Sequence, residues 1–272
     1  MTLILTWMFP FGIVMGADSA ITFRSRYVID NLGRRRPLIL LGGTKIFPIP
    51  KIHAGISFWG NANIGNSTTF EWLSNFIYSR ENEYNNIHDF AILLQNELRN
   101  VVPELTEPED SLEYRYGKRG FHLAGFVEHE GKPIPTMYHI HNGLSETNPE
   151  INPRVINANH DFPPEKVAEL FSRGQVPNLR NGDFFLYSDL FDKLYSSFNQ
   201  WSRLLSIEGR PFVFPDPKKF ANPLDAYAEF VRFWIRLVRD VYALSNMPEI
   251  IGGEIRVLSI TTDGRINVSV KP

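Results

Sequence analysis

The stretch 2-TLILTWMFPFGIVMGADSAIT-22 contains two apolar runs on either side of a turn signal. Residues 2–8 alternate in the manner of a strand, and residues 9–12 (Phe-Pro-Phe-Gly) are typical of a turn. Residues 12–17 are apolar on both faces, as in a strand that is covered on both sides. The pattern predicts a hairpin that lies deep in the core of a folded domain.

Three interpretations of this stretch compete: a secretory signal, an ordinary first hairpin, and a strand whose first residue is a catalytic nucleophile. A signal peptide needs a basic start, but no lysine or arginine precedes Arg24. Pro10, Gly12 and Gly16 also interrupt the apolar run. We therefore favour the other two interpretations and expect a cytoplasmic protein.

Composition excludes several classes of function. The 272 residues contain 28 basic and 30 acidic side chains, which gives no reason to expect a nucleic acid or an anionic membrane as partner. Cysteine is absent, so disulfides, thiolate zinc sites and cysteine nucleophiles are excluded. No apolar run reaches the roughly 18 residues of a membrane span.

Beyond the first hairpin, strand and helix patterns alternate in blocks. An arginine-rich loop is expected from residue 23, before a strand at 38–41, and the stretch 45–58 is strand-like but has prolines typical of an edge or a bend. Residues 144–163 have the composition of a long connection. The remaining predictions are strands at 121–127, 136–141, 254–260 and 266–270, and helices at 68–78, 87–101, 164–173, 181–205 and 223–245. This order predicts an α+β architecture of sheets covered by helices.

Thr2 gains a chemical role if Met1 is removed, as methionine aminopeptidases generally do before a small residue. Its own α-amine, with an ordinary pKa of about 7.7–8.0, is then a base for its hydroxyl. A nearby ammonium keeps such an amine neutral by like-charge repulsion. Lys45 is the candidate for that ammonium, and Asp18 is the candidate anion beside it if the first hairpin forms.

These residues resemble the start of the proteasome β-subunit family of N-terminal nucleophile (Ntn) hydrolases. The matching pieces are Thr2, GIVMGADSAIT at 12–22, GGTKIFPI at 42–49 and ISFWGNAN at 56–63. Asp18 lies sixteen residues after Thr2, which is the family's spacing. Two later stretches, 120–143 and 250–264, resemble the family's middle hairpin and closing strand.

The resemblance implies a fold and a set of roles. The fold is a single four-layer αββα domain over residues 1–272, in which residues 144–245 form a poorly matched insert. Thr2 is the nucleophile, Asp18 and Lys45 support it, and Thr22 binds an extended substrate through its backbone. The loop 58–63 supplies an oxyanion amide: gapless counting selects Trp59, but the chemistry favours Gly60.

The implied protein is a threonine peptidase or amidohydrolase that acts on peptide or small amide substrates without a cofactor or metal. It is also implied to form a homo-oligomer, such as a ring. Two family features are missing: an aspartate–serine pair before Gly252, where Glu249 is the nearest acid, and a Ser-Gly motif after residue 143. An inactive structural or regulatory subunit of the same fold is therefore the alternative.

His139 and His141 stand two apart on a predicted strand, so both rings point to one face. Such a pair can bind a metal only with further ligands. We interpret it as a hydrogen-bonded or exposed pair.

Overall fold

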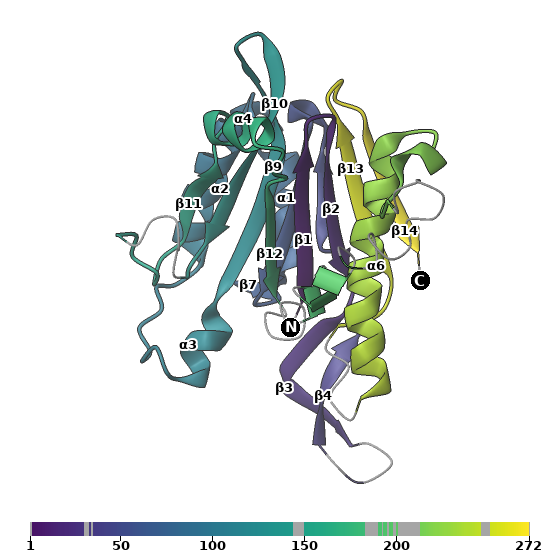
Figure 1. The fold of residues 1–272 in the computed structure, drawn as a ribbon. Helices are drawn as coiled ribbons and strands as arrows, with labels where there is room; N and C mark the ends of the chain where they lie inside the picture. Colours follow the sequence, from purple (N-terminus) through teal and green to yellow (C-terminus); the bar gives the residue numbers. More distant parts are fainter. Residues whose placement is uncertain are drawn as a thin grey trace.

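The computed structural model describes most of the chain, namely residues 2–29, 33, 35–143, 150–182, 190, 191, 193, 194, 196, 197, 200, 213–245 and 251–271. Two five-stranded antiparallel sheets form its centre (Figure 1). No helix within these ranges is long and apolar enough to cross a membrane.

The first sheet is built around the predicted hairpin. Strands β1 (Leu3–Phe9) and β2 (Gly12–Asp18) pair with each other. Strand β13 (Ile255–Thr261) pairs with β2, and β14 (Ile266–Lys271) forms the edge. At the other edge, β12 (Asn178–Gly182) pairs with β1. The hairpin therefore lies between two segments that are distant in sequence.

The second sheet has the order β11-β10-β9-β6-β5. Its centre is the long hairpin of β9 (Arg119–His129) and β10 (Lys132–His141). On either side lie β11 (Asn157–Phe162) and β6 (Ala54–Gly60), and β5 (Ile46–Ile49) ends the sheet. Pro48 lies in that edge strand and Pro50 begins a short 3-10 turn, as the two prolines predicted.

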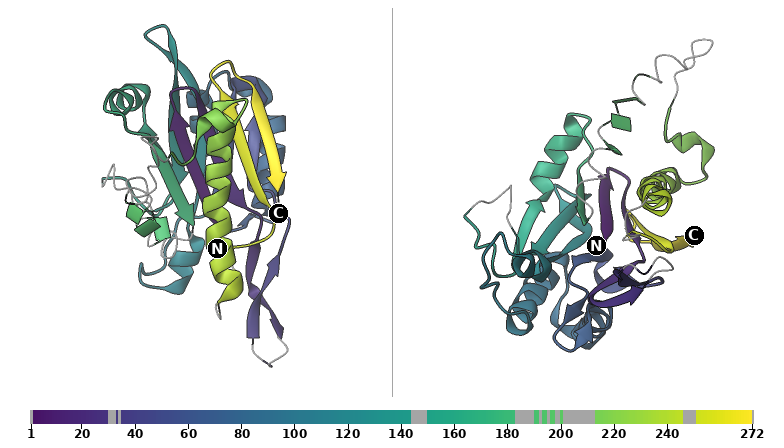
Figure 2. Two further views of the ribbon diagram at one scale, coloured as in Figure 1. Left: turned by 45° about the vertical axis from the view of Figure 1, so that its right-hand side comes forward. Right: turned by 90° about the horizontal axis from the view of Figure 1, so that it is seen from below.

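Helices cover the outer face of each sheet. Helices α1 (Thr69–Ser79) and α2 (Ile87–Val101) begin at hydrogen-bonded caps, Thr68 and Asn86, and pack on the second sheet. The 22-residue helix α6 (Pro223–Leu244) packs on the first sheet. A third apolar cluster, which includes Ile4, Met8, Met15, Ala124 and Met137, fills the space between the sheets. The predicted α+β sandwich of helix, sheet, sheet and helix layers is confirmed (Figures 1 and 2).

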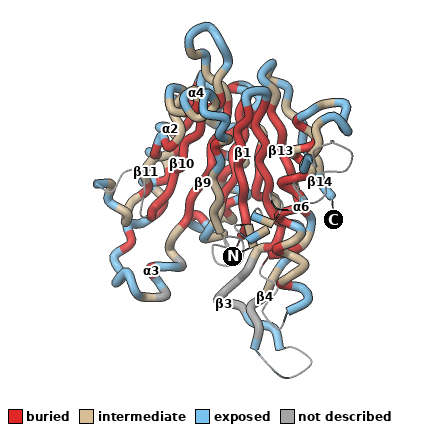
Figure 3. The backbone as a smooth tube through the Cα atoms, in the orientation of Figure 1, coloured by how far each residue is buried: buried red, intermediate tan, exposed pale blue. Residues whose placement is uncertain are grey.

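Alternation along β1 explains why this hairpin is apolar on both faces. Leu3, Leu5 and Trp7 pack in the cluster with α6, whereas Ile4 and Met8 pack between the sheets. Every residue of β1 and β2 is buried (Figure 3). The contact with α6 is so close that a Cβ on Gly16 would lie 2.3 Å from Val231 Cγ1.

Three predicted segments differ from the structure. Most of the expected loop from residue 23 is a two-stranded ribbon of β3 (Ile21–Ile29) and β4 (Arg35–Leu40), because the two segments pair with each other, and the strand expected at 38–41 overlaps the end of β4. The expected connection at 144–163 contains β11, since its backbone pairs with β10. Residues 181 and 182 belong to β12 rather than to a helix, and most of the rest of the predicted 181–205 helix falls outside the described residues.

The remaining described elements are short. Strands β7 (Asn63–Ile64) and β8 (Ser67–Thr68) form a small pair before α1. Helix α3 (Leu112–Gly117) precedes β9. Helix α4 (Pro164–Ser172) starts at a proline, as predicted, and contacts the β9–β10 hairpin.

Candidate functional site

The first hairpin brings the two ends of its strands together. Thr2 stands immediately before β1 and is 5% exposed, and Asp18 is the last residue of β2 and is 1% exposed. Asp18 Oδ1 accepts a hydrogen bond of 2.9 Å from the backbone amide of Leu3. The aspartate is therefore tied to the residue that directly follows Thr2.

The Asp18 carboxylate is surrounded by donors. Its Oδ1 also accepts from Lys45 Nζ at 2.9 Å, and its Oδ2 accepts from the amides of Ala20 at 3.1 Å and Gly252 at 3.3 Å. An ionised carboxylate offers about four acceptor sites. The four hydrogen bonds use this capacity and replace the water that burial removes.

Lys45 reaches this carboxylate from the residue before β5 and is only 2% exposed. Burial lowers the pKa of Lys45 below its ordinary value, although the adjacent Asp18 carboxylate acts in the opposite direction. Because Leu3 N and Lys45 Nζ both lie 2.9 Å from one oxygen, the lysine nitrogen is close to the start of β1. Thr2, Asp18 and Lys45 thus belong to one small region of the structure.

Gly60 ends β6, two residues after Phe58, whose amide donates to the carbonyl oxygen of Lys45 at 3.1 Å. Its φ of 88° is positive, and a Cβ there would lie 2.3 Å from the carbonyl oxygen of Lys118. The backbone therefore requires glycine at this position for a local reason. An oxyanion role for its amide stays a prediction.

Thr22 lies in β3 opposite Ile39, beyond the end of the first hairpin. Its backbone is extended, the conformation that pairs with an extended peptide. The side chain of Thr22 lies outside the described residues, as does Glu249. Substrate binding by the Thr22 backbone stays a prediction.

Two glycines at this end of the sheet make contacts that the sequence did not predict. The amide of Gly252 reaches Asp18, and the carbonyl of Gly252 accepts from the Ser19 amide at 3.2 Å. A Cβ on Gly182 would lie 1.4 Å from the carbonyl oxygen of Thr2. Only glycine therefore allows the end of β12 to lie this close to the start of β1. The Gly-Gly pair at 252–253 was a signal of close backbone approach, but the sequence did not indicate what it approaches.

A second polar group lies farther along the space between the sheets. We name it the histidine cluster: His122 on β9 with His139 and His141 on β10. The ring centroids of His139 and His141 are 3.9 Å apart, and His122 meets His139 edge-on at 5.3 Å. All three are at most 7% exposed. The sequence left open whether His139 and His141 are hydrogen-bonded or exposed, and the structure shows that both are buried and hydrogen-bonded.

Polar partners from several strands hold the histidine cluster. His122 bonds Thr6 Oγ1 through Nδ1 at 2.9 Å and Asn181 Oδ1 through Nε2 at 2.5 Å, so it joins the two sheets. Asn159 Nδ2 donates to His141 Nε2 at 2.8 Å. Burial, the largest cause, lowers the pKa of both His122 and His141 to about 3. These rings are neutral at neutral pH.

His139 connects the histidine cluster to β6 and β11. Trp59 Nε1 donates to His139 Nε2 at 3.3 Å, and His139 Nδ1 lies 3.6 Å from Asp161 Oδ2. Across the described part of the chain, no group of three or more His, Asp or Glu side chains is arranged to hold a metal ion. The cluster is therefore a hydrogen-bonded network in this structure.

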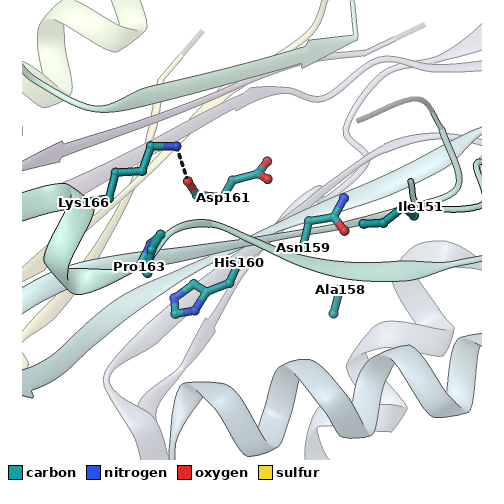
Figure 4. A pocket seen from close by; sticks show the side chains of 7 residues that line it. All are labelled: Ile151, Ala158, Asn159, His160, Asp161, Pro163 and Lys166. Atoms are coloured by element: carbon teal, nitrogen blue, oxygen red, sulfur yellow. Dashed lines mark hydrogen bonds between the residues drawn. The ribbon is translucent and has the colours of Figure 1, made fainter. Parts of the chain in front are cut away.

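A cavity of about 360 Å³ lies beside β11 and the start of α4 (Figure 4). It is lined by Ile151, Ala158, Asn159, His160, Asp161, Pro163 and Lys166, and Lys166 Nζ donates to the Asp161 carbonyl at 2.8 Å. β11 is the edge strand opposite β5. Four strand spacings of about 4.8 Å place it roughly 19 Å from β5 across the sheet. The cavity is thus separate from Lys45 and its partners.

Comparisons with known proteins add little to this geometry. No family profile and no curated protein matches the chain. Among solved structures, the chain is similar to a Gly-1 mutant of Anbu from Hyphomicrobium sp. strain MC1, with 12% identity and a TM-score of 0.47. The match covers 100% of this chain and 86% of the Anbu chain. At that distance the likeness assigns no function, so the functional argument rests on the residues of this chain.

Proposed function

We propose that this protein is an Ntn hydrolase that cleaves amide bonds with Thr2 after removal of Met1. One observation carries the proposal. A single buried oxygen, Asp18 Oδ1, accepts hydrogen bonds of 2.9 Å from the amide that follows Thr2 and from Lys45 Nζ. A buried lysine is thereby held beside the first residue of β1, where its charge can lower the pKa of the α-amine of Thr2.

The reaction needs no group from outside the chain except water. The α-amine of Thr2 takes the hydroxyl proton while Thr2 Oγ attacks the amide carbonyl of the substrate. The tetrahedral intermediate collapses, the proton passes from the α-ammonium to the departing amine, and an ester to Thr2 remains. Water then attacks this ester with the same amine as base, which releases the acid and restores the hydroxyl.

Lys45 and Asp18 act on this chemistry through charge. A lysine ammonium close to the α-amine lowers the pKa of that amine and keeps it neutral, which is the form that accepts a proton. Asp18 keeps the lysine in place and in turn is anchored by three backbone amides. The Gly60 amide, at the end of β6, is the proposed donor to the developing oxyanion.

The sequence also supports a second candidate, a non-catalytic member of the same fold. Its support is the missing aspartate–serine pair before Gly252. The two candidates share the Asp18–Lys45 pair as a structural feature, but they differ in whether Thr2 has a free amine and a reactive hydroxyl.

Mass spectrometry and covalent labelling test the proposal. The intact protein should lack Met1, and a β-lactone or epoxyketone probe should modify Thr2. The Thr2→Ala variant should lose labelling and amide hydrolysis, whereas Thr2→Ser, which keeps a hydroxyl, should retain labelling. Retention of Met1, or equal labelling of the Thr2→Ala variant, would contradict the enzyme and leave the non-catalytic candidate.

A further inference from the structure

The cavity beside β11, hereafter the β11 cavity, lies at an edge of the second sheet. Among the described strands, β11 pairs only with β10. Asn159 and Asp161 project from one face of β11 (Figure 4). Ala158 and His160 project from the other face, and all four residues line the cavity. Its volume of about 360 Å³ is in the range of pockets that hold small organic molecules.

One acceptor in the β11 cavity lacks a donor. Asn159 is 6% exposed, and its Nδ2 donates to His141 Nε2 at 2.8 Å. The other end of the amide, Oδ1, has no hydrogen-bond partner within the described residues. A buried polar atom without a partner is costly, so a water molecule or a ligand is needed to supply the donor. The cavity has room for much more than one water molecule.

Charged groups of both signs stand next to Asn159. Asp161 is 8% exposed, and its side chain lies on the same face of β11 as that of Asn159 (Figure 4). Lys166, in the first turn of α4, donates one of its three hydrogens to the carbonyl oxygen of Asp161 at 2.8 Å. Lys166 Nζ also lies 4.9 Å from the centre of the Phe162 ring. These two contacts hold the ammonium at the wall of the cavity.

This lining separates classes of ligand. A simple anion would meet Lys166 but would be repelled by the Asp161 carboxylate and the Asn159 oxygen. A simple cation would meet those oxygens but would be repelled by Lys166. An α-amino acid carries an ammonium and a carboxylate close together, so it can satisfy both. Ile151 and Pro163 add an apolar wall for a side chain.

We propose that the β11 cavity binds a free α-amino acid with an apolar side chain. The ammonium of the ligand donates to Asn159 Oδ1 and to the Asp161 carboxylate, and its carboxylate accepts from Lys166. This binding is non-covalent. It does not depend on the amide hydrolysis proposed for Thr2, because β11 and β5 lie at opposite edges of the sheet.

Calorimetric titration of the full-length protein with L-leucine and two analogues tests the assignment of charges. L-Leucine should bind once per chain. N-acetyl-L-leucine lacks the ammonium and L-leucinamide lacks the carboxylate. Each analogue should therefore bind about tenfold or more weakly than L-leucine, because each loses hydrogen bonds to a charged group.

Two single substitutions assign each charge to its residue. Lys166→Met should weaken binding of L-leucine by about tenfold and leave binding of L-leucinamide unchanged, because the amide offers Lys166 no carboxylate. Asp161→Asn should weaken binding of both L-leucine and L-leucinamide, since both carry the ammonium. Lys219→Met is the matched control: Lys219 is exposed in the 3-10 turn at Pro217–Lys219, next to α6, and its loss should not change binding.

Two further variants separate binding from folding and from catalysis. Asn159→Leu removes the unpaired acceptor and should abolish binding of L-leucine. It also removes the donor to His141, so thermal unfolding checks that the variant folds, and Asp161→Asn decides if it does not. Thr2→Ala should bind L-leucine like the wild type. Failure of Thr2 labelling and failure of amino-acid binding are therefore distinguishable.

Three results would overturn the proposal. If L-alanine, L-valine and L-leucine all fail to bind at millimolar concentrations, the β11 cavity holds only water. If N-acetyl-L-leucine binds as tightly as L-leucine, the oxygens of Asn159 and Asp161 do not receive an ammonium. If Lys166→Met weakens L-leucine and L-leucinamide equally, the lysine does not contact the carboxylate of the ligand.

Discussion

Two buried polar regions in this protein treat charge in opposite ways. At the start of β1, Asp18 and Lys45 form an ion pair that is almost completely buried, and backbone amides supply the remaining hydrogen bonds. In the histidine cluster, burial holds His122 and His141 neutral, and amide and hydroxyl groups supply the partners. The first region keeps a charge inside the protein, whereas the second excludes one.

This difference in charge indicates different roles for the Asp18–Lys45 ion pair and the histidine cluster. A buried ion pair is expensive and seldom stabilises a fold better than apolar residues do, so its presence beside Thr2 favours a chemical role. The neutral His122 ring on β9 bonds Thr6 on β1 and Asn181 on β12, so it links the two sheets without a net charge. We therefore expect the first region to control activity and the second to control stability.

Removing one partner of the ion pair should produce the largest effect. Asp18→Asn leaves Lys45 buried without its anion and should lower the free energy of unfolding by about 3–5 kcal/mol. Lys45→Met should cost less, because Asp18 keeps three backbone donors. Urea denaturation measures both, and both variants should lose Thr2 labelling. Equal costs would show that the lysine, and not the backbone, holds the carboxylate.

The second largest effect should be a loss of stability at acidic pH, caused by the histidine cluster. His122 and His141 have pKa values of about 3 in the folded protein, compared with 6.5 as the ordinary value. The unfolded chain therefore binds protons that the folded one does not, and stability falls as pH drops below about 6.5. Between pH 7 and pH 5 each ring should cost about 2 kcal/mol.

Chemical denaturation at pH 7, 6 and 5 measures this loss. His141→Gln removes one titrating ring. The slope of the free energy of unfolding against pH should then correspond to one proton fewer than in the wild type. An unchanged slope in this variant would mean that the pKa of His141 is the same in the folded and unfolded protein.

The smallest effect should come from the connection between the two regions. Trp59→Phe removes the donor to His139 Nε2 while keeping an aromatic ring next to Gly60. The cost should be about 0.5–1.5 kcal/mol of stability, and the rate of Thr2 labelling should change little. A large loss of labelling at unchanged stability would instead show that the histidine cluster positions the Gly60 loop.

Local patterns predicted much of this fold. Alternation at 2–8 predicted β1, the doubly apolar run after the Phe-Pro-Phe-Gly turn predicted β2, and helical spacing predicted α1, α2 and α6 nearly to their observed bounds. Loop composition concealed β3 and the first half of β4, and β11 was missed because its asparagines and histidine do not look like strand residues. Pairing with a neighbouring strand overrides weak propensity, and pairing is not visible in a single sequence.

For the candidate site, the sequence by itself determined which groups carry charge and their spacing: Thr2, Asp18 sixteen residues later, and Lys45 before a strand. It also determined that the first hairpin must be covered on both faces. Only the tertiary structure decided that the Gly252 amide would complete the shell of Asp18, and that His122 and His141 would lie neutral between the sheets. The physical reason is that desolvation and hydrogen bonding depend on neighbours more than a hundred residues away along the chain, which meet only when the two sheets pack.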